Sequence, residues 1–300
     1  MSVIFLFIDG VGLGKEEEPN PFLRDSYRGF SAMAGGQLFS ATADELKDEE
    51  HVFKAVDATL DVDGLPQSGT GQAALFSGEN APKEIGKHFG PFPHSGTKHL
   101  LKQYSLFTKA QQLGKKCQFM NAYPEIFFKK AQKRNRWTCT TLMTKNADIT
   151  LNTTEDVKQQ RALTAELTQE AWKKQLNIDV PEISPQAAAE RLLEQTAHWD
   201  LLLHEYYLTD KAGHSQEAEQ ASRYLDTYDR FLWQLIKQKP SNTTIVLSSD
   251  HGNIEDLSVK THTLNNVPLF AYGPGARHFS GAENIMDVTP GILRSLDSSS

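Results

Sequence analysis

Residues 243–253, TTIVLSSDHGN, place a β-branched apolar run directly before two strongly polar side chains. Residues 244–247 are typical of a parallel strand that is covered on both faces. Asp250 and His251 follow at the predicted carboxyl end of this strand, where open α/β sheets bind their ligands. Two interpretations are open at this point: Asp250 caps a helix beside an incidental histidine, or both side chains belong to a binding site.

Two further segments share this design. The run SVIFLFIDGVGLG (residues 2–14) reaches Asp9, and WDLLLHEYYLTDKAGH (residues 199–214) reaches Asp210 and His214. Helical patterns such as SPQAAAERLLEQTAHW (residues 184–199) alternate with these strands, which indicates βα units. The sequence therefore predicts an α/β fold with a mainly parallel sheet and helices on both faces.

The pattern changes between about residues 81 and 183. Polar helical stretches such as KHLLKQYSLFTKAQQLGKK (residues 98–116) appear there, together with the proline-rich HFGPFPHS (residues 88–95). We therefore expect an inserted α+β cap at residues 81–183 and a core made of residues 1–80 and 184–300. The terminal serines 298–300 are expected to be frayed.

Composition limits the class of protein. The 300 residues carry a net charge of −7, so no basic stripe is available for nucleic acid. Cys117 and Cys139 lack CxxC spacing, which favours a reduced, cytoplasmic setting. The first apolar run has no basic leader and is too short to span a bilayer, so we expect a first strand and no membrane partner. The oligomeric state is left open.

Carboxylates and imidazoles follow the predicted strands at one edge of the sheet. With a histidine from KTHTLNNVP (residues 260–268), the set is Asp9, Asp210, His214, Asp250, His251 and His262. Mixed oxygen and nitrogen ligands suit Zn²⁺ or Mn²⁺. Six ligands exceed the needs of one ion, so two divalent cations are predicted, and two-metal sites serve in-line displacement at phosphorus.

A nucleophile is predicted in DGLPQSGTGQAALFSG (residues 63–78), which offers Ser68, Thr70 and Ser77. Thr70 lies between two glycines just before a helical run, where its hydroxyl could meet a metal ion. The N–H groups at a helix start would face an incoming anion. We therefore predict Thr70 as both metal ligand and nucleophile. Capping of the helix by Thr70 is compatible with this role.

These motifs together resemble the alkaline phosphatase superfamily of metalloenzymes, in the branch of cofactor-independent phosphoglycerate mutase and phosphopentomutase. The matching pieces are FIDGVGLG, LPQSGTGQAALFSG, DKAGH, SSDHGN and HTLNNVP. The resemblance implies one ion held by Asp210, His214 and His262. It implies a second ion held by Asp9, Asp250, His251 and the Thr70 hydroxyl, with Thr70 transiently phosphorylated.

The resemblance is weaker in the predicted cap. PHSGTKHLL (residues 93–101) is similar to the mutase stretch around its His-Ser pair, which implies His94 at a substrate phosphate. Lys87 and Lys98 are expected to face the metals with it. NAYPEIF (residues 121–127) replaces the arginine-bearing mutase segment. We therefore predict dimetal phosphoryl transfer or hydrolysis on a small phosphate ester through a phosphothreonine, with a true mutase or a non-catalytic binding protein as alternatives.

Two other enzyme classes are disfavoured. Glycines 10, 12 and 14 do not make the GxGxxG spacing of a dinucleotide-binding oxidoreductase. A sulfatase needs a cysteine or serine matured to formylglycine, which Thr70 cannot become.

Overall fold

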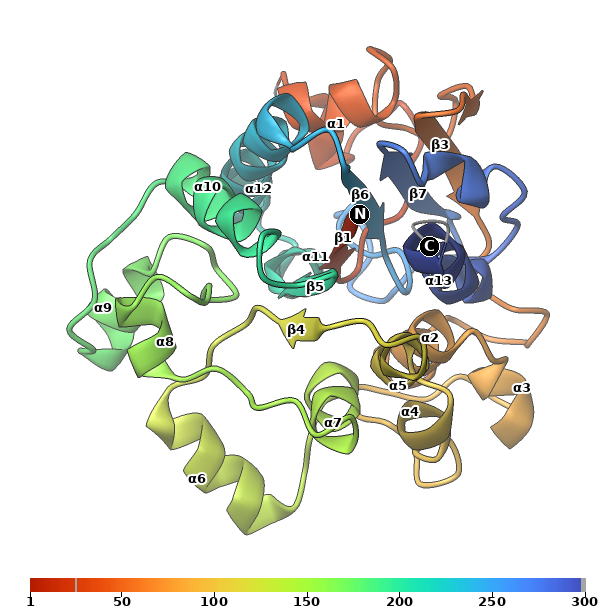
Figure 1. Cartoon of the computed structure of the whole chain (residues 1–300). Coiled ribbons are helices and arrows are strands. Elements are labelled where there is room, and N and C mark those ends of the chain that lie inside the picture. Colours follow the sequence, from red (N-terminus) through yellow and green to blue (C-terminus); the bar gives the residue numbers. More distant parts are fainter. Residues whose placement is uncertain (25, 298–300) are drawn as a thin grey trace.

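The computed structural model describes residues 1–24 and 26–297, and the terminal serines expected to be frayed lie outside these ranges. A seven-stranded sheet forms the centre, in the order β2-β3-β7-β6-β1-β5-β4 (Figure 1). The strands are β1 (Ser2–Ile8), β2 (Leu46–Lys47), β3 (His51–Val56), β4 (Cys117–Phe119), β5 (Leu201–Tyr206), β6 (Thr243–Ser248) and β7 (Val267–Tyr272).

The three predicted strands lie side by side at the centre of the sheet. β1 pairs in parallel with β5 on one side and with β6 on the other, and Ile8 lies opposite Tyr206 and Phe7 opposite Ser248. Every residue of these strands is buried. The α/β class is confirmed. Beyond β6 the sheet is antiparallel: β7 pairs with β6 and with β3, and β3 pairs with β2. The sequence pattern did not indicate this antiparallel part.

Helices cover both faces of the sheet, because successive side chains of a strand point to opposite faces. Val3, Phe5 and Phe7 join one apolar cluster, whereas Ile4 and Leu6 join the other. The first cluster lies under α2 (Ser68–Ser77), α5 (Leu106–Gln112), α7 (Cys139–Asn146) and α13 (Val288–Asp297). The second lies under α1 (Arg28–Met33), α10 (Pro185–Gln195) and α12 (Ala218–Gln238).

The remaining elements are short. They are η1 (Pro21–Leu23), α3 (Ala81–Ile85), α4 (Leu100–Gln103), α6 (Glu125–Arg134), α8 (Thr154–Lys158), α9 (Glu170–Leu176), α11 (Leu208–Ser215), η2 (Ala276–Phe279) and η3 (Ile285–Asp287). Among the described residues, no helix has the length and apolar character needed to cross a membrane.

Residues 81–183 contribute to the sheet as well as to its surroundings. β4 pairs with β5, and Phe107 and Phe119 belong to the same apolar cluster as Phe5. Other residues of the segment, among them Val157 and Trp172, form a small cluster of their own. The division into a core and a cap stays a prediction.

The start of α1 is held by a carboxylate from another helix. Asp229 on α12 accepts hydrogen bonds from Arg28 N at 3.0 Å and Phe30 N at 2.9 Å. The N-cap residue Tyr27 makes no side-chain capping bond of its own. Asp229 therefore satisfies N–H groups that the helix start leaves without a local partner.

Asp229→Ala should lower the free energy of unfolding by about 2 kcal/mol, the loss expected for a buried cap. Thermal unfolding followed by circular dichroism measures the change. Asp226→Ala is the control, because Asp226 lies one turn away on α12 and makes an exposed ion pair with Arg230. Equal melting temperatures for the two variants would contradict this account of α1.

Candidate active site

Polar side chains from three strand ends meet at one edge of the sheet. Asp9 follows β1, Asp250 and His251 follow β6, and Asp210 lies on α11 directly after β5. Gly10 permits the turn out of β1, since it adopts a φ of +66° and a Cβ there would lie 2.7 Å from Asp210 Cβ. The parallel register of the strands therefore brings distant parts of the chain together.

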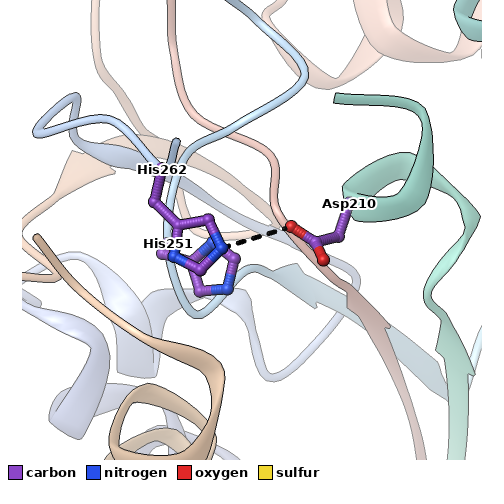
Figure 2. Close-up of side chains that lie close together, drawn as sticks. All are labelled: Asp210, His251 and His262. Atoms are coloured by element: carbon purple, nitrogen blue, oxygen red, sulfur yellow. Dashed lines mark ion pairs between the residues drawn. The ribbon is translucent and has the colours of Figure 1, made fainter. Parts of the chain in front are cut away.

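The side chains form two overlapping groups that could hold a metal ion. Asp9, Asp250 and His251 make one group, and Asp210, His251 and His262 make the other, each with ligand atoms within 4.8 Å of one another. His251 Nε2 lies 3.5 Å from Asp9 Oδ1 and 3.4 Å from Asp250 Oδ2. Figure 2 shows His262 directed at Asp210, with 3.6 Å between His262 Nε2 and Asp210 Oδ1. His251 is thus close to both groups.

His214 also reaches the second group. Its Nε2 lies 3.4 Å from Asp210 Oδ2 and 3.3 Å from His262 Nε2. Main-chain carbonyls lie at the Nδ1 atoms of both histidines, Lys260 O for His214 and Pro66 O for His262. Such contacts fix a ring with Nε2 toward the cluster, as is usual for metal-binding histidines. The structure therefore brings together all six predicted carboxylates and imidazoles.

Charge at this edge is poorly compensated by the protein. Within the described residues, the buried Asp9 Oδ1 and Asp250 Oδ2 have no hydrogen-bond partner. Burial raises the pKa of Asp9 well above its usual range, and the Asp250 charge adds to the rise. Burial lowers the pKa of His251 and His262, which favours neutral rings. Unpaired carboxylate oxygens beside neutral imidazoles fit a divalent cation.

Ser68 was one of the three candidate nucleophiles in the sequence, from which Thr70 was chosen. It is the first residue of α2, and its Oγ lies 3.0 Å from His251 Nε2. The hydroxyl of Thr70 instead donates to Gln67 O and accepts from Phe89 N, and none of its described contacts is with the cluster. The metal and nucleophile roles of Thr70 stay predictions. The helix start at Ser68, directly after the Pro-Gln pair, was the available sequence signal.

The loops that carry the cluster are held by Glu255, a residue that sequence reasoning missed. Glu255 Oε2 accepts from Gly12 N at 2.8 Å and from Asn253 N at 2.7 Å, and Oε1 contacts Thr263 Oγ1. Asn253 Nδ2 in turn donates to Asp210 Oδ1 at 2.6 Å. One buried carboxylate therefore joins the loop after β1 to the loop after β6.

A cavity of about 580 Å³ opens beside the cluster. Its lining includes Asp9, Ser68, Gln72, Glu205 and Asp210 at the sheet edge. The rest of the lining comes largely from residues of the 81–183 segment, with Phe92, Tyr123, Phe127 and Trp172 among them. Burial raises the pKa of Glu205 to about 7, and its Oε2 accepts from Thr140 Oγ1 at 2.7 Å.

The three residues predicted to reach substrate from the cap are placed elsewhere. His94 packs edge-on against Phe89 with ring centroids 4.9 Å apart, and its Nδ1 accepts from Gly96 N. Lys87 and Lys98 are exposed. None of the three lines the cavity in the described part of the chain. Their substrate role stays a prediction without a supporting contact.

The fold is of the α/β type, and the cluster at its sheet edge could hold metal ions. The model of the metalloenzyme superfamily matches residues 1–299, and the chain belongs to that family. The membership agrees with the resemblance to metalloenzymes that the motifs indicated.

Curated relatives match part of the chain. It is 30% identical over 125 residues to the 2,3-bisphosphoglycerate-independent phosphoglycerate mutase of Mycoplasmoides gallisepticum, which is 39% of this chain and 25% of the relative. It is 32% identical over 126 residues to the mutase of the same name from Thiobacillus denitrificans, covering 38% and 24%. The matched stretch thus spans about a quarter of the length of these relatives.

Solved structures share the fold over the whole chain. Alkaline phosphatase from the Antarctic bacterium TAB5 aligns with a TM-score of 0.58 and 12% identity, covering 98% of this chain and 97% of that one. Leishmania mexicana phosphoglycerate mutase aligns with a TM-score of 0.53 and 12% identity, covering 99% and 95%. At these identities the likeness concerns the fold.

Glu255→Ala should lower the free energy of unfolding by about 3 kcal/mol, because two main-chain N–H groups would lose a buried charged acceptor. Chemical denaturation measures the loss. Asp256→Ala is the neighbouring control, since Asp256 accepts from the main chain and hydroxyl of Ser258 near the surface. A loss below about 0.5 kcal/mol in Glu255→Ala would show that the loops do not depend on this carboxylate.

Proposed function

We propose that this protein is a metal-dependent phosphoryl-transfer enzyme acting on a small phosphate ester. The observation that carries the proposal is the pair of overlapping ligand groups beside Ser68 at the edge of one cavity. The family is one of metalloenzymes, and mutases and phosphatases occur among the matches. Two-metal sites of mixed carboxylate and imidazole ligands serve this reaction class.

Two divalent cations, Mn²⁺ or Zn²⁺ by ligand type, are proposed for the site. One would be held by Asp210, His214 and His262. The other would be held by Asp9, Asp250 and His251, with the nearby serine hydroxyl. When bound, the cations would neutralise charge on the phosphate and lower the pKa of the nucleophile.

Ser68 is proposed as the nucleophile in place of Thr70. Its Oγ lies against His251, whereas the Thr70 hydroxyl is engaged by main-chain groups. Ser68 also opens a ten-residue helix, and the amino end of a helix favours an anion. Attack of Oγ on phosphorus would break the ester bond, leave a phosphoserine and release the alcohol, which takes up the hydroxyl proton.

The fate of that phosphoserine separates two candidate activities. Attack by water makes the enzyme a phosphatase, and attack by a second alcohol makes it a mutase. The mutase relatives support the mutase activity, but they match this chain over only about a quarter of their own length. A small phosphorylated substrate, without nucleic acid or membrane, is the proposed partner in either case.

The purified protein should take up two Mn²⁺ or Zn²⁺ ions per chain, because the ligands divide into two sets. His214→Ala should lose mainly one ion and Asp250→Ala mainly the other. Elemental analysis after removal of free metal gives the stoichiometry. A protein that retains no transition metal after soaking would contradict the dimetal site.

Ser68→Ala should reduce turnover of a generic aryl phosphate by about a thousandfold or more, because the covalent step loses its nucleophile. Thr70→Ala is the matched control in the same turn of α2 and should lose far less. Intact-mass measurement on rapidly quenched wild-type enzyme should show one added phosphoryl group, mapped to Ser68. A label on Thr70, or normal turnover by Ser68→Ala, would restore Thr70 as the better candidate.

A further inference from the structure

The cavity beside the cluster has an aromatic wall. Phe92, Tyr123, Phe127, Trp172 and Tyr207 all line it, and Tyr123 and Phe127 stack with ring centroids 4.0 Å apart. A volume of about 580 Å³ is within the range of pockets that enclose a small organic ligand. The cavity therefore has room for a ring-sized group next to a phosphate at the sheet edge.

The charge of the lining is of one sign. In residues 1–24 and 26–297 the lining holds no lysine, arginine or histidine, and its carboxylic acids are Asp9, Asp210, Glu166 and Glu205. The Arg136 guanidinium lies 4.5 Å from the Phe92 ring centroid but is not part of the lining. A second anion on the ligand would thus be buried without a cationic partner from the wall, which is costly.

The two glutamates away from the proposed metal ligands are held in place. Glu205 accepts from Thr140 at 2.7 Å. Glu166 accepts from the Thr168 hydroxyl at 2.6 Å and from the Thr164 hydroxyl at 3.2 Å. Both side chains therefore keep their positions on the wall, where neither supplies a positive charge to an anionic group.

Resting on the function proposed above, we infer that the substrate is a phosphate monoester of an uncharged aromatic alcohol. The phosphate lies at the ligand groups of the sheet edge, and the aromatic group lies against Tyr123, Phe127 and Trp172. An ester with a second anion, such as 3-phosphoglycerate, is disfavoured because its carboxylate would enter the acidic, aromatic part of the cavity.

Binding of two non-hydrolysable probes tests the inference without turnover. 2-Phenylethylphosphonate carries an uncharged ring, and 3-phosphonopropionate carries a carboxylate at a similar distance from phosphorus. Calorimetry with the Mn²⁺-loaded protein should give a Kd at least tenfold lower for the phenyl probe. Equal or tighter binding of 3-phosphonopropionate, or binding of neither probe, would overturn the inference.

Two neighbouring phenylalanines of α6 provide a matched pair of variants. Phe127 lines the cavity, whereas Phe128 is also half-buried but packs against the apolar core and meets the lining residues Phe127 and Tyr123 only edge-on, from outside the cavity. Phe127→Ala should raise the Kd of the phenyl probe about tenfold and leave that of methylphosphonate unchanged. Phe128→Ala should raise the Kd of the phenyl probe by less than threefold and leave that of methylphosphonate unchanged, and thermal unfolding verifies that both variants fold. Equal effects of the two variants on the phenyl probe would overturn the inference.

Turnover separates this inference from the proposed function. 2-Phenylethyl phosphate and 3-phosphoglycerate are both primary alkyl esters, so their kcat/KM ratio reports recognition more than leaving-group chemistry. A preference of at least tenfold for the phenyl ester supports both proposals. A kcat/KM for 3-phosphoglycerate that equals or exceeds that for the phenyl ester overturns the inference and supports phosphoryl transfer. Tight binding of the phenyl probe without turnover of any ester rejects phosphoryl transfer and supports the aromatic selectivity.

Discussion

Repulsion between buried carboxylates is the constraint on which the site depends. Asp9 and Asp250 follow neighbouring parallel strands, so the register of β1 and β6 places their side chains together. Each has a buried oxygen without a hydrogen-bond partner among the described residues, and burial raises the pKa of both. The fully buried central strands hold this arrangement in place. A cation between the carboxylates would offset the repulsion, which is the physical basis of the proposed metal site.

The loops around the carboxylates are fixed by hydrogen bonds between segments distant in sequence. Glu255 accepts from Gly12 and Asn253, and Asn253 donates to Asp210. Gly12 lies so close to Glu255 that a Cβ at this position would collide with the carboxylate. These contacts orient the ligand groups before any ligand arrives, and preorganisation of this kind is what catalysis by electrostatic stabilisation requires.

The sheet edge and the cavity wall have different origins in the chain. The ligand groups come from loops that follow central strands, and much of the wall comes from residues within 91–176. β4 joins that segment to the sheet by pairing with β5, the strand that leads to Asp210. The scaffold can therefore position the reacting groups while the wall selects the organic part of a substrate, as is common where one fold serves several functions.

The sequence by itself determined the central strands and the residues at their ends. Apolar runs that stop at Asp9, Asp210 and Asp250 are local patterns, and parallel pairing then brings the ends to one edge. The antiparallel side of the sheet, the position of Ser68 against His251 and the role of Glu255 were decided by the tertiary structure. Each depends on contacts between segments far apart in sequence, for example 183 residues between Ser68 and His251. Ser68 and Thr70 both carry a hydroxyl in one glycine-rich turn, so the sequence does not distinguish them. The folded start of α2 does, because it places the Ser68 hydroxyl against His251 and the Thr70 hydroxyl against main-chain groups.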